Sequence, residues 1–500
     1  MLFNSLLFLL GYAPTVFVIY FWLGRRENLT PVIWLAFASL VFYAWWSPSQ
    51  TIILAISIGF NFLCGHLILK LDWSSKIIRK ALLALAISVN LLALCYYKYA
   101  HFIFNEIAAT AGLGWSFPPI ILPLGISFFT FTQIAYLVDA YQGKVRKSEL
   151  FRYILFVTYF PHLIAGPIIH HGAVMPQFAT KGAARFNSTN FAVGIALFSI
   201  GLFKKVVMAD TVAGYADPIF TAAEAGVSLG FVGSWTGALA YSMQLYYDFS
   251  GYSDMAIGLS LMLNVRLPFN FNSPYKAVSI IDFWSRWHIS LSTFLRDYLY
   301  IPLGGNRRGN LRRYINLFLT MVIGGIWHGA GWPFLIWGIL HGVYLIINHG
   351  WLQLREASKG KIPMLNRTSA KLLTLFAVIV AWVFFRATNI SVAMQIITAM
   401  ACLNGMGAWN IAVEQSTVAS AISPAIWISV MMLIALYAPN SQELSTHVLV
   451  REDYFKIGNK TNTIGAWRMP HPIYAVMLGL ITSTALIHIS RPTKFLYFNF

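Results

Sequence analysis

Apolar stretches of about twenty residues recur along the whole chain, and short polar loops that hold most of the basic residues separate them. An α-helix of that length crosses the hydrocarbon core of a bilayer. Segments with alternating polar and apolar positions, the mark of an outer-membrane barrel, do not recur. The pattern therefore predicts an all-α, polytopic membrane protein. Its candidate spans lie at 5–23, 31–47, 51–69, 81–97, 121–140, 153–172, 189–208, 229–249, 251–265, 314–328, 333–351, 371–388, 419–438 and 471–490.

The composition agrees with these spans and leaves no room for a large soluble domain. Of the 500 residues, 58% are hydrophobic and 10% are charged, whereas a soluble domain has about 25% charged residues. We expect one integral membrane domain over 1–500, with the chemical motifs in a core at 120–390 and a last helix with an aromatic tail at 471–500. Because the stretch 1–23 lacks a charged first region and a cleavage site, we interpret it as the first span.

The basic residues predict which loops face the cytoplasm. Lys and Arg number 35 against 17 acidic residues, and the basic clusters fall between an odd-numbered span and the next even one. By the positive-inside rule those loops are cytoplasmic, which puts both termini outside and explains the positive charge without nucleic acid. Lys181 and Arg185 depart from the rule. The same topology places the turn after His328 and the tail that contains Tyr497 on the outer side, where the two side chains can meet.

His328 is the strongest single candidate for chemistry. It follows Trp327 in an apolar stretch that four glycines interrupt between residues 324 and 331. Ionisable residues at membrane depth point to function by default, and a neutral imidazole can take the proton of an attacking hydroxyl. The residues alone leave open a second interpretation, a structural histidine that is hydrogen-bonded to a neighbouring helix.

The stretch 266–303 is not an ordinary span. It carries more polar groups than a lipid-facing helix tolerates, namely Arg286, His288, Arg296 and Asp297. Large apolar residues nevertheless recur there at helical spacing, so the stretch predicts a buried or re-entrant helix. We expect Asp282 to begin this helix, as N-cap or first-turn anion, and the run at 304–306 to end it.

The polar residues of that stretch have two possible roles each. His288 is either catalytic, or it is an orienting residue or a contact to a ligand headgroup. Arg286 and Arg296 either form ion pairs with Asp282 and Asp297 or bind a phosphate of the acyl donor. The block at 246–254 either lines a pore with its hydroxyls and carboxylates or forms hydrogen bonds between helices.

The C-terminal tail offers one nucleophile. Its sequence at 495–500 is FLYFNF, in which Tyr497 has the hydroxyl group. A phenol with a pKa near 10 needs a base, which a histidine at the same membrane face would supply. The alternative is that the tail is an aromatic belt at the membrane interface.

Several motifs together resemble the membrane-bound O-acyltransferase (MBOAT) family, in particular its AlgI-like branch of bacterial alginate, cellulose and peptidoglycan O-acetylation proteins. The resemblance covers most of 1–390. It rests on DFWSRWHISLSTFLRDYLYIPLGGN at 282–306, GGIWHG at 324–329, QLYYDFSGYSDM at 244–255, LIAGPI at 163–168 and GLFKK at 201–205.

The resemblance implies a ring- or funnel-shaped helical bundle with re-entrant helices and a central tunnel. The family's near-invariant catalytic histidine corresponds to His328, and its second conserved histidine corresponds to His288. Relatives that transfer D-alanine use a partner peptide with a similar aromatic, Tyr-containing end, so Tyr497 would be the transient acyl acceptor here. The residues expected along the substrate and donor tunnel are Trp327, Arg286, Trp287, Arg296, Tyr247, Asp248 and Gln244.

The expected reaction is acetyl transfer across a bacterial inner membrane. The donor would be a cytoplasmic thioester, acetyl-CoA, and no bound cofactor or metal is expected, since Cys64, Cys95 and Cys402 lack metal-ligand spacing. A periplasmic or cell-surface SGNH-type acetyltransferase would be the partner and a polysaccharide the final acceptor. The alternatives are transfer of another acyl group, such as D-alanine from a carrier protein, and a transporter. No internal repeat of the transporter kind is present.

Overall fold

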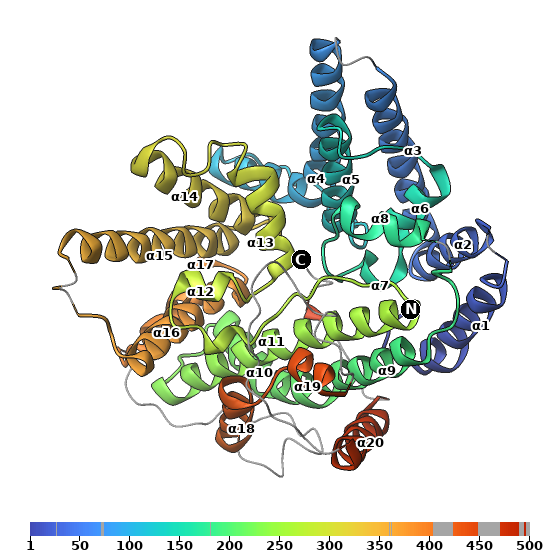
Figure 1. Cartoon of the computed structure of the whole chain (residues 1–500). Helices are drawn as coiled ribbons and strands as arrows, with labels where there is room; N and C mark the ends of the chain where they lie inside the picture. The colour runs from blue at the N-terminus through green and yellow to red at the C-terminus, as the bar shows by residue number, and fades with distance from the viewer. Residues whose placement is uncertain are drawn as a thin grey trace. The chain divides into compact units, whose positions relative to one another are not determined.

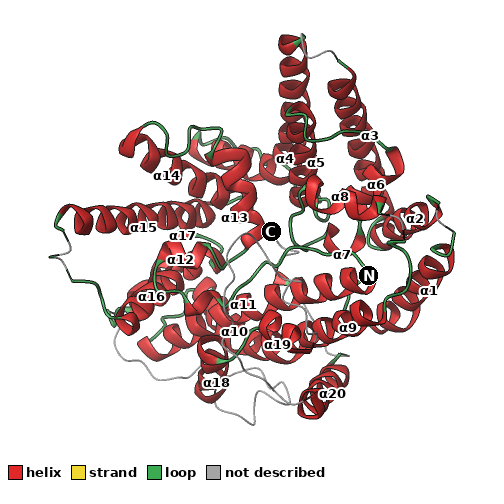
Figure 2. Cartoon of the chain, viewed as in Figure 1, coloured by secondary structure: helices red, strands yellow, loops and turns green. Residues whose placement is uncertain are grey.

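The computed structural model consists of helices and connecting loops (Figure 1). It describes residues 1–26, 28–71, 75–180, 182–359, 361, 363–403, 424–448, 471–489 and 495–496. Every regular element in these ranges is helical (Figure 2). The all-α fold class predicted from the sequence is therefore confirmed.

The chain divides into two compact units, and the division falls within two of its helices, α9 and α11. The first unit comprises Met1–Ile200 and Tyr252–Pro268. Its helices are η1 (Leu7–Tyr12), α1 (Ala13–Leu23), α2 (Thr30–Ala44), α3 (Pro48–Lys70), α4 (Lys76–Thr110), α5 (Ile126–Tyr141), α6 (Leu150–Thr158), α7 (Phe160–Leu163), α8 (His171–Ala179), most of α9 (Ser188–Phe203) and the end of α11 (Phe231–Met262).

The second unit comprises Gly201–Gly251 and Phe269–Phe500 and contains the histidine motifs. Besides the first part of α11, its helices are η2 (Lys204–Ala209), α10 (Asp210–Glu224), η3 (Pro274–Lys276), α12 (Ile280–Trp284), α13 (Ile289–Leu295), η4 (Arg296–Tyr300), α14 (Gly309–His328), α15 (Trp332–Ala357), α16 (Arg367–Arg386), α17 (Ile390–Met400), α18 (Pro424–Tyr437), α19 (Ser441–Val448) and α20 (His471–His488).

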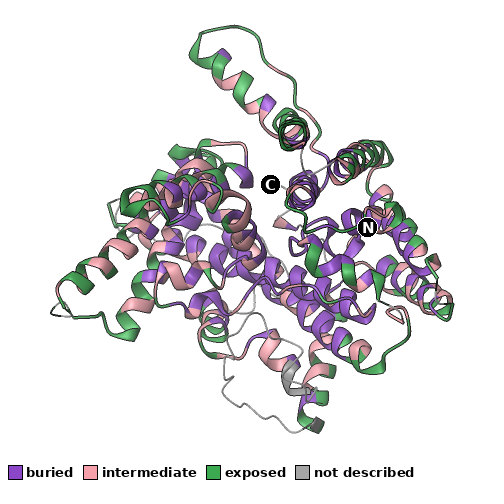
Figure 3. Ribbon diagram, turned by 45° about the horizontal axis from the view of Figure 1, so that its top comes forward, coloured by how far each residue is buried: buried purple, intermediate pink, exposed green. Residues whose placement is uncertain are grey.

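Five helical stretches of the described residues are long and apolar enough to cross a membrane. They are α3, α4, the continuous stretch Ser188–Glu224, α15 and α16. Large apolar side chains on the outside of such helices are expected, because lipid and not water faces them. Ile77 and Leu92 of α4 are exposed in this way, whereas α5 is buried at almost every position (Figure 3).

In two places the structure divides the predicted spans differently. The spans predicted at 229–249 and 251–265 form the single helix α11. Gly251 does not break this helix: a Cβ there would lie 2.7 Å from the carbonyl oxygen of Gly201, so the glycine permits a close approach of two backbones. The span predicted at 153–172 is instead divided into α6, α7 and a loop.

Helices α14 and α15 form an antiparallel pair in which glycines allow close contact (Figure 1). A Cβ on Gly325 would lie 2.5 Å from the carbonyl oxygen of Phe334, and a Cβ on Gly338 would lie 2.6 Å from that of Met321. Both contacts are with backbone atoms, which cannot turn aside as a side chain can. The close pairing therefore depends on these two glycines.

Gly338→Ala is expected to destabilise the protein by about 1–3 kcal/mol, because its methyl group forces α14 and α15 apart. Gly350→Ala, also in α15, is the matched control, since a Cβ there meets nothing within 4 Å and alanine favours the helix. Thermal unfolding in detergent measures both. Equal midpoints for the two variants would contradict the proposed close packing.

Candidate active site

His328 is the last residue of α14 and lies in an aromatic pocket. Its side chain is buried, and its ring centroid lies 5.0 Å from that of Trp337 and 5.1 Å from that of Phe385. The helix ends there because Gly329 is extended and α15 begins almost at once. A Cβ on Gly329 would lie 2.2 Å from the Phe334 ring, so any larger residue there would require this ring to move. Gly329 thus lets the chain turn from α14 into α15 directly after His328.

His288 lies between α12 and α13 in a left-handed backbone conformation, with φ 42° and ψ 54°. Its side chain is 0% exposed. The Oδ1 atom of Asn270 accepts hydrogen bonds from the backbone N–H (3.1 Å) and the hydroxyl (2.8 Å) of Ser290 and lies 3.2 Å from Nδ1 of His288. Non-glycine residues rarely adopt such a conformation, so these bonds hold a locally strained turn in place.

The same bonds define the tautomer of His288. The backbone N–H of Ser290 needs an acceptor, so the Asn270 amide is oriented with its oxygen, and not its nitrogen, at this point. Nδ1 of His288 must therefore be the donor toward this oxygen. Burial lowers the pKa of His288, which lies outside the five candidate spans, to about 3. The ring is therefore neutral near pH 7, with a lone pair on Nε2.

The structure brings the two histidine motifs together. The ring centroids of His288 and His328 lie 6.4 Å apart. Trp327 lies beside both rings, at 6.4 Å from His288 and 5.0 Å from His328. Phe249 of α11 covers His288 at 4.7 Å. Residues far apart in the sequence thus form one cluster around the two imidazoles.

A third histidine, His341 of α15, lies 4.8 Å from Trp337, and its sequence context did not single it out. The cluster of His288, His328, His341, Trp327, Trp337 and Phe385 is called the histidine pocket below. Nδ1 of His341 accepts a hydrogen bond from Nε1 of Trp284 at 3.2 Å, so in the neutral ring Nε2 carries the proton. Neither this N–H nor Nε1 of Trp337 has a hydrogen-bond acceptor among the described residues, and both are buried. An unmatched buried donor costs about 1–3 kcal/mol. The pair suits a substrate that brings an acceptor such as a carbonyl oxygen.

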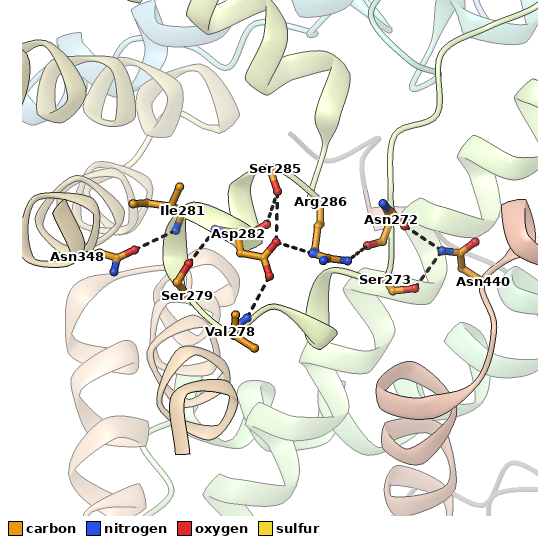
Figure 4. A network of polar contacts seen from close by, with 10 residues as sticks. All are labelled: Asn272, Ser273, Val278, Ser279, Ile281, Asp282, Ser285, Arg286, Asn348 and Asn440. Carbon is orange, nitrogen blue, oxygen red and sulfur yellow. Dashed lines mark hydrogen bonds and ion pairs between the residues drawn. The ribbon is translucent and has the colours of Figure 1, made fainter. Parts of the chain in front are cut away.

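The segment before His288 is held by the polar network in Figure 4. Arg286 pairs with Asp282 at 2.7 Å between Nε and Oδ1 and donates to the carbonyl of Asn272 at 3.2 Å. Asn440 donates to the side chains of Asn272 and Ser273 at 3.1 and 3.0 Å. Of the two roles predicted for Arg286, this geometry provides the ion pair.

The single helix predicted from Asp282 to the glycines at 304–306 is wrong. The N-cap of α12 is Ser279, whose hydroxyl accepts from the backbone N–H of Asp282 at 3.1 Å, and Asp282 is a first-turn anion. The helix then stops at Trp284 and resumes at Ile289. The helix breaks because the side chain of Asn270 binds Nδ1 of His288 and the backbone N–H of Ser290. In a continuous helix these two groups would point in other directions.

Four other predicted tunnel residues differ in burial and in the groups that they contact. Trp287 is buried against Trp382 at 4.9 Å. The hydroxyl of Tyr247 donates to the carbonyl of Met431 in α18 at 2.8 Å, which is the predicted alternative of bonding between helices. Gln244 is buried, and Arg296 pairs with the adjacent Asp297 near the surface. Their roles along a tunnel stay predictions.

Tyr497 and Lys181 lie outside the described residues. Phe495 and Leu496, which precede Tyr497, are described and lie against Lys205 and Asp248. A tunnel residue predicted from the sequence, Asp248, is thus next to the tail.

Comparisons with known proteins show what this chain is similar to. The model of the MBOAT family, membrane-bound O-acyltransferases, matches residues 126–390. The peptidoglycan O-acetyltransferase of Helicobacter pylori is 39% identical, over all of this chain and 98% of its own length. The probable alginate O-acetylase AlgI of Pseudomonas aeruginosa is 41% identical, over 82% of this chain and 76% of its own length. The teichoic acid D-alanyltransferase of Bacillus subtilis is 30% identical over 46% of this chain and 60% of its own length.

Proposed function

Because this chain belongs to the membrane-bound O-acyltransferase family, we propose that it transfers acetyl groups toward a polysaccharide outside the cytoplasm. It is an acyltransferase and a multi-pass protein of a bacterial inner membrane. The observation that carries the proposal is the pair of buried histidines, 6.4 Å apart, in a pocket with two buried N–H donors.

In the proposed reaction His328 is the general base. Its imidazole takes the proton of an acceptor hydroxyl, whose oxygen attacks the thioester carbonyl carbon. The new C–O bond forms, the C–S bond breaks, and the imidazolium returns the proton to the departing thiolate. The N–H groups of Trp337 and His341 are suited to donate to the carbonyl oxygen as negative charge develops on it. His288, with its neutral ring held by Asn270, would orient the acceptor through Nε2.

Acetyl-CoA is the proposed donor and a polysaccharide of the peptidoglycan or alginate type the proposed final acceptor. The relatives named for O-acetylation match most or all of this chain, whereas the D-alanyltransferase matches less than half of it. This difference favours acetyl over D-alanyl transfer. An SGNH-type acetyltransferase outside the cytoplasm would pass the acetyl group to the polymer.

Tyr497 is the proposed first acceptor, since it directly follows the described segment that lies against Asp248. Incubation of the purified protein with acetyl-CoA should add an acetyl mass to the C-terminal peptide. The adduct should be lost in Tyr497→Phe, which lacks the hydroxyl, and in His328→Ala, which lacks the base. Peptide mass spectrometry measures the adduct in all three proteins.

Polymer acetylation in cells is the measurement that can contradict the proposed role of Tyr497. If cells with Tyr497→Phe acetylate their polysaccharide normally and no adduct forms on the wild-type tail, the tyrosine relay is wrong. Direct transfer to the partner or the glycan would then replace it. If polymer acetylation is lost in His328→Ala but not in Tyr497→Phe, the assignment of His328 as the base still stands.

A further inference from the structure

A buried group of three charged side chains, none of which belongs to the histidine pocket, lies in the second unit. Nζ of Lys205 lies 2.7 Å from Oδ1 of Asp248 and 2.7 Å from Oδ1 of Asp210. The side chains of Lys205 and Asp248 are 1% and 2% exposed. Burying such a pair costs so much desolvation that apolar residues of similar size often stabilise a protein equally well. Stability is therefore a weak explanation for it.

Local structure explains how these charges meet. Lys205 is the second residue of the π-helix η2, in which residue i bonds with residue i+5, and Asp210, five residues later, is its C-cap. The backbone N–H of Asp210 donates to the carbonyl of Lys205, which brings the two side chains to one side. Asp248 approaches from α11. The π-helical turn, frequent at functional sites, thus presents the lysine.

Two residues of the C-terminal segment, Phe495 and Leu496, contact this charged group. The backbone N–H of Leu496 donates to Oδ2 of Asp248 at 3.1 Å, while the other oxygen of Asp248 faces Lys205. The buried ring of Phe495 lies over Lys205, with 4.5 Å between the ring centroid and Nζ. Each charge of the ion pair therefore makes a specific contact with the tail, a charge-assisted hydrogen bond in one case and a cation–π contact in the other.

The same turn of α11 links the tail to the histidine pocket. Asp248 binds Leu496, and its neighbour Phe249 covers the ring of His288 at 4.7 Å. We propose that Lys205 and Asp248 are positioning residues, which dock the C-terminal aromatic segment of this chain beside the histidine pocket. The docking rests on the contacts of Phe495 and Leu496 and holds whether or not Tyr497 carries an acyl group.

Carboxypeptidase digestion of the full-length protein in detergent tests the docking. The double variant Lys205→Met/Asp248→Leu removes both tail contacts and one charge of each sign. It should remain folded, because the charge that is left, Asp210, is 17% exposed and retains access to water. Release of Leu496 and Phe495, followed by mass spectrometry, should become about tenfold to a hundredfold faster than in the wild type, as the loss of a charge-assisted hydrogen bond and a cation–π contact implies. Asp217→Asn disturbs the ion pair of Arg386 elsewhere in the unit and should leave the release rate unchanged.

Wild-type release rates in the folded double variant would overturn the proposal. If the double variant does not fold, Asp248→Asn decides by the same measurement, because it keeps the pair of Lys205 and Asp210. The release rate is measured without any acyl donor. A failure of docking and a failure of the Tyr497 relay are therefore distinguishable.

Discussion

Replacement of His328 by alanine or glutamine is expected to lower acyl transfer by about 10²–10⁴-fold, the usual contribution of a general base. Glutamine keeps much of the size and hydrogen-bonding capacity of the imidazole but cannot accept a proton near pH 7. The His328→Gln variant should therefore fold like the wild type and still be inactive. Acetyl release from acetyl-CoA by purified protein, together with the thermal midpoint, measures the two effects.

The control for His328 is His66→Gln in α3, a histidine of the first unit that stacks on Phe62 at 6.0 Å. It should keep wild-type turnover. Addition of free imidazole to His328→Ala should restore part of the rate, because the substitution leaves space in an aromatic pocket where the base stood. Wild-type turnover in His328→Gln would refute the assignment of His328 as the base.

Asn270→Ala is expected to destabilise the protein by about 3 kcal/mol or more, since each unmatched buried donor costs about 1–3 kcal/mol. The substitution removes the acceptor that three donors share, namely the Nδ1–H of His288 and the N–H and hydroxyl of Ser290. The left-handed turn at His288 should relax, so activity should fall with stability. Chemical or thermal unfolding in detergent and acetyl transfer measure the two losses.

Asn348→Ala is the matched control for Asn270, because Asn348 accepts a longer hydrogen bond, at 3.4 Å, from Ile281 in the same unit. Its effect should stay near 1 kcal/mol or less. Asn270→Asp keeps the acceptor oxygen and adds a negative charge, which favours the imidazolium and raises the pKa of His288. The pH dependence of activity should shift in Asn270→Asp. If Asn270→Ala is as stable as Asn348→Ala, Asn270 does not hold the turn.

Local pattern was enough to predict much of this protein. Long apolar runs predicted the helices, because a chain without water must satisfy its backbone polar groups within each helix. The glycines around His328 predicted a break, which the structure shows as the end of α14 at Gly329. Both features depend on residues within one or two turns of each other, and such relations can be read along the sequence.

Relations between distant residues were decided by tertiary structure. The break at His288 depends on Asn270, eighteen residues earlier. The side-chain oxygen of Asn270 accepts hydrogen bonds that carbonyl oxygens of a continuous helix would otherwise accept. His341 becomes part of the pocket only because α12 and α16 surround α15 with Trp284 and Trp382.

The charged group at the tail shows the same division most clearly. In the sequence Lys205 belongs to the basic pair at 204–205 and Asp248 to the polar block at 246–254, and Asp248 was predicted as a tunnel residue with no named partner. Only the fold brings them within 2.7 Å and sets Phe495 and Leu496 against them. The sequence by itself determined the helices, the membrane setting and the two histidine motifs, since these follow from local hydrophobicity and short motifs. Tertiary structure decided which polar groups meet, because hydrogen bonds and ion pairs between distant residues depend on packing that no local pattern specifies.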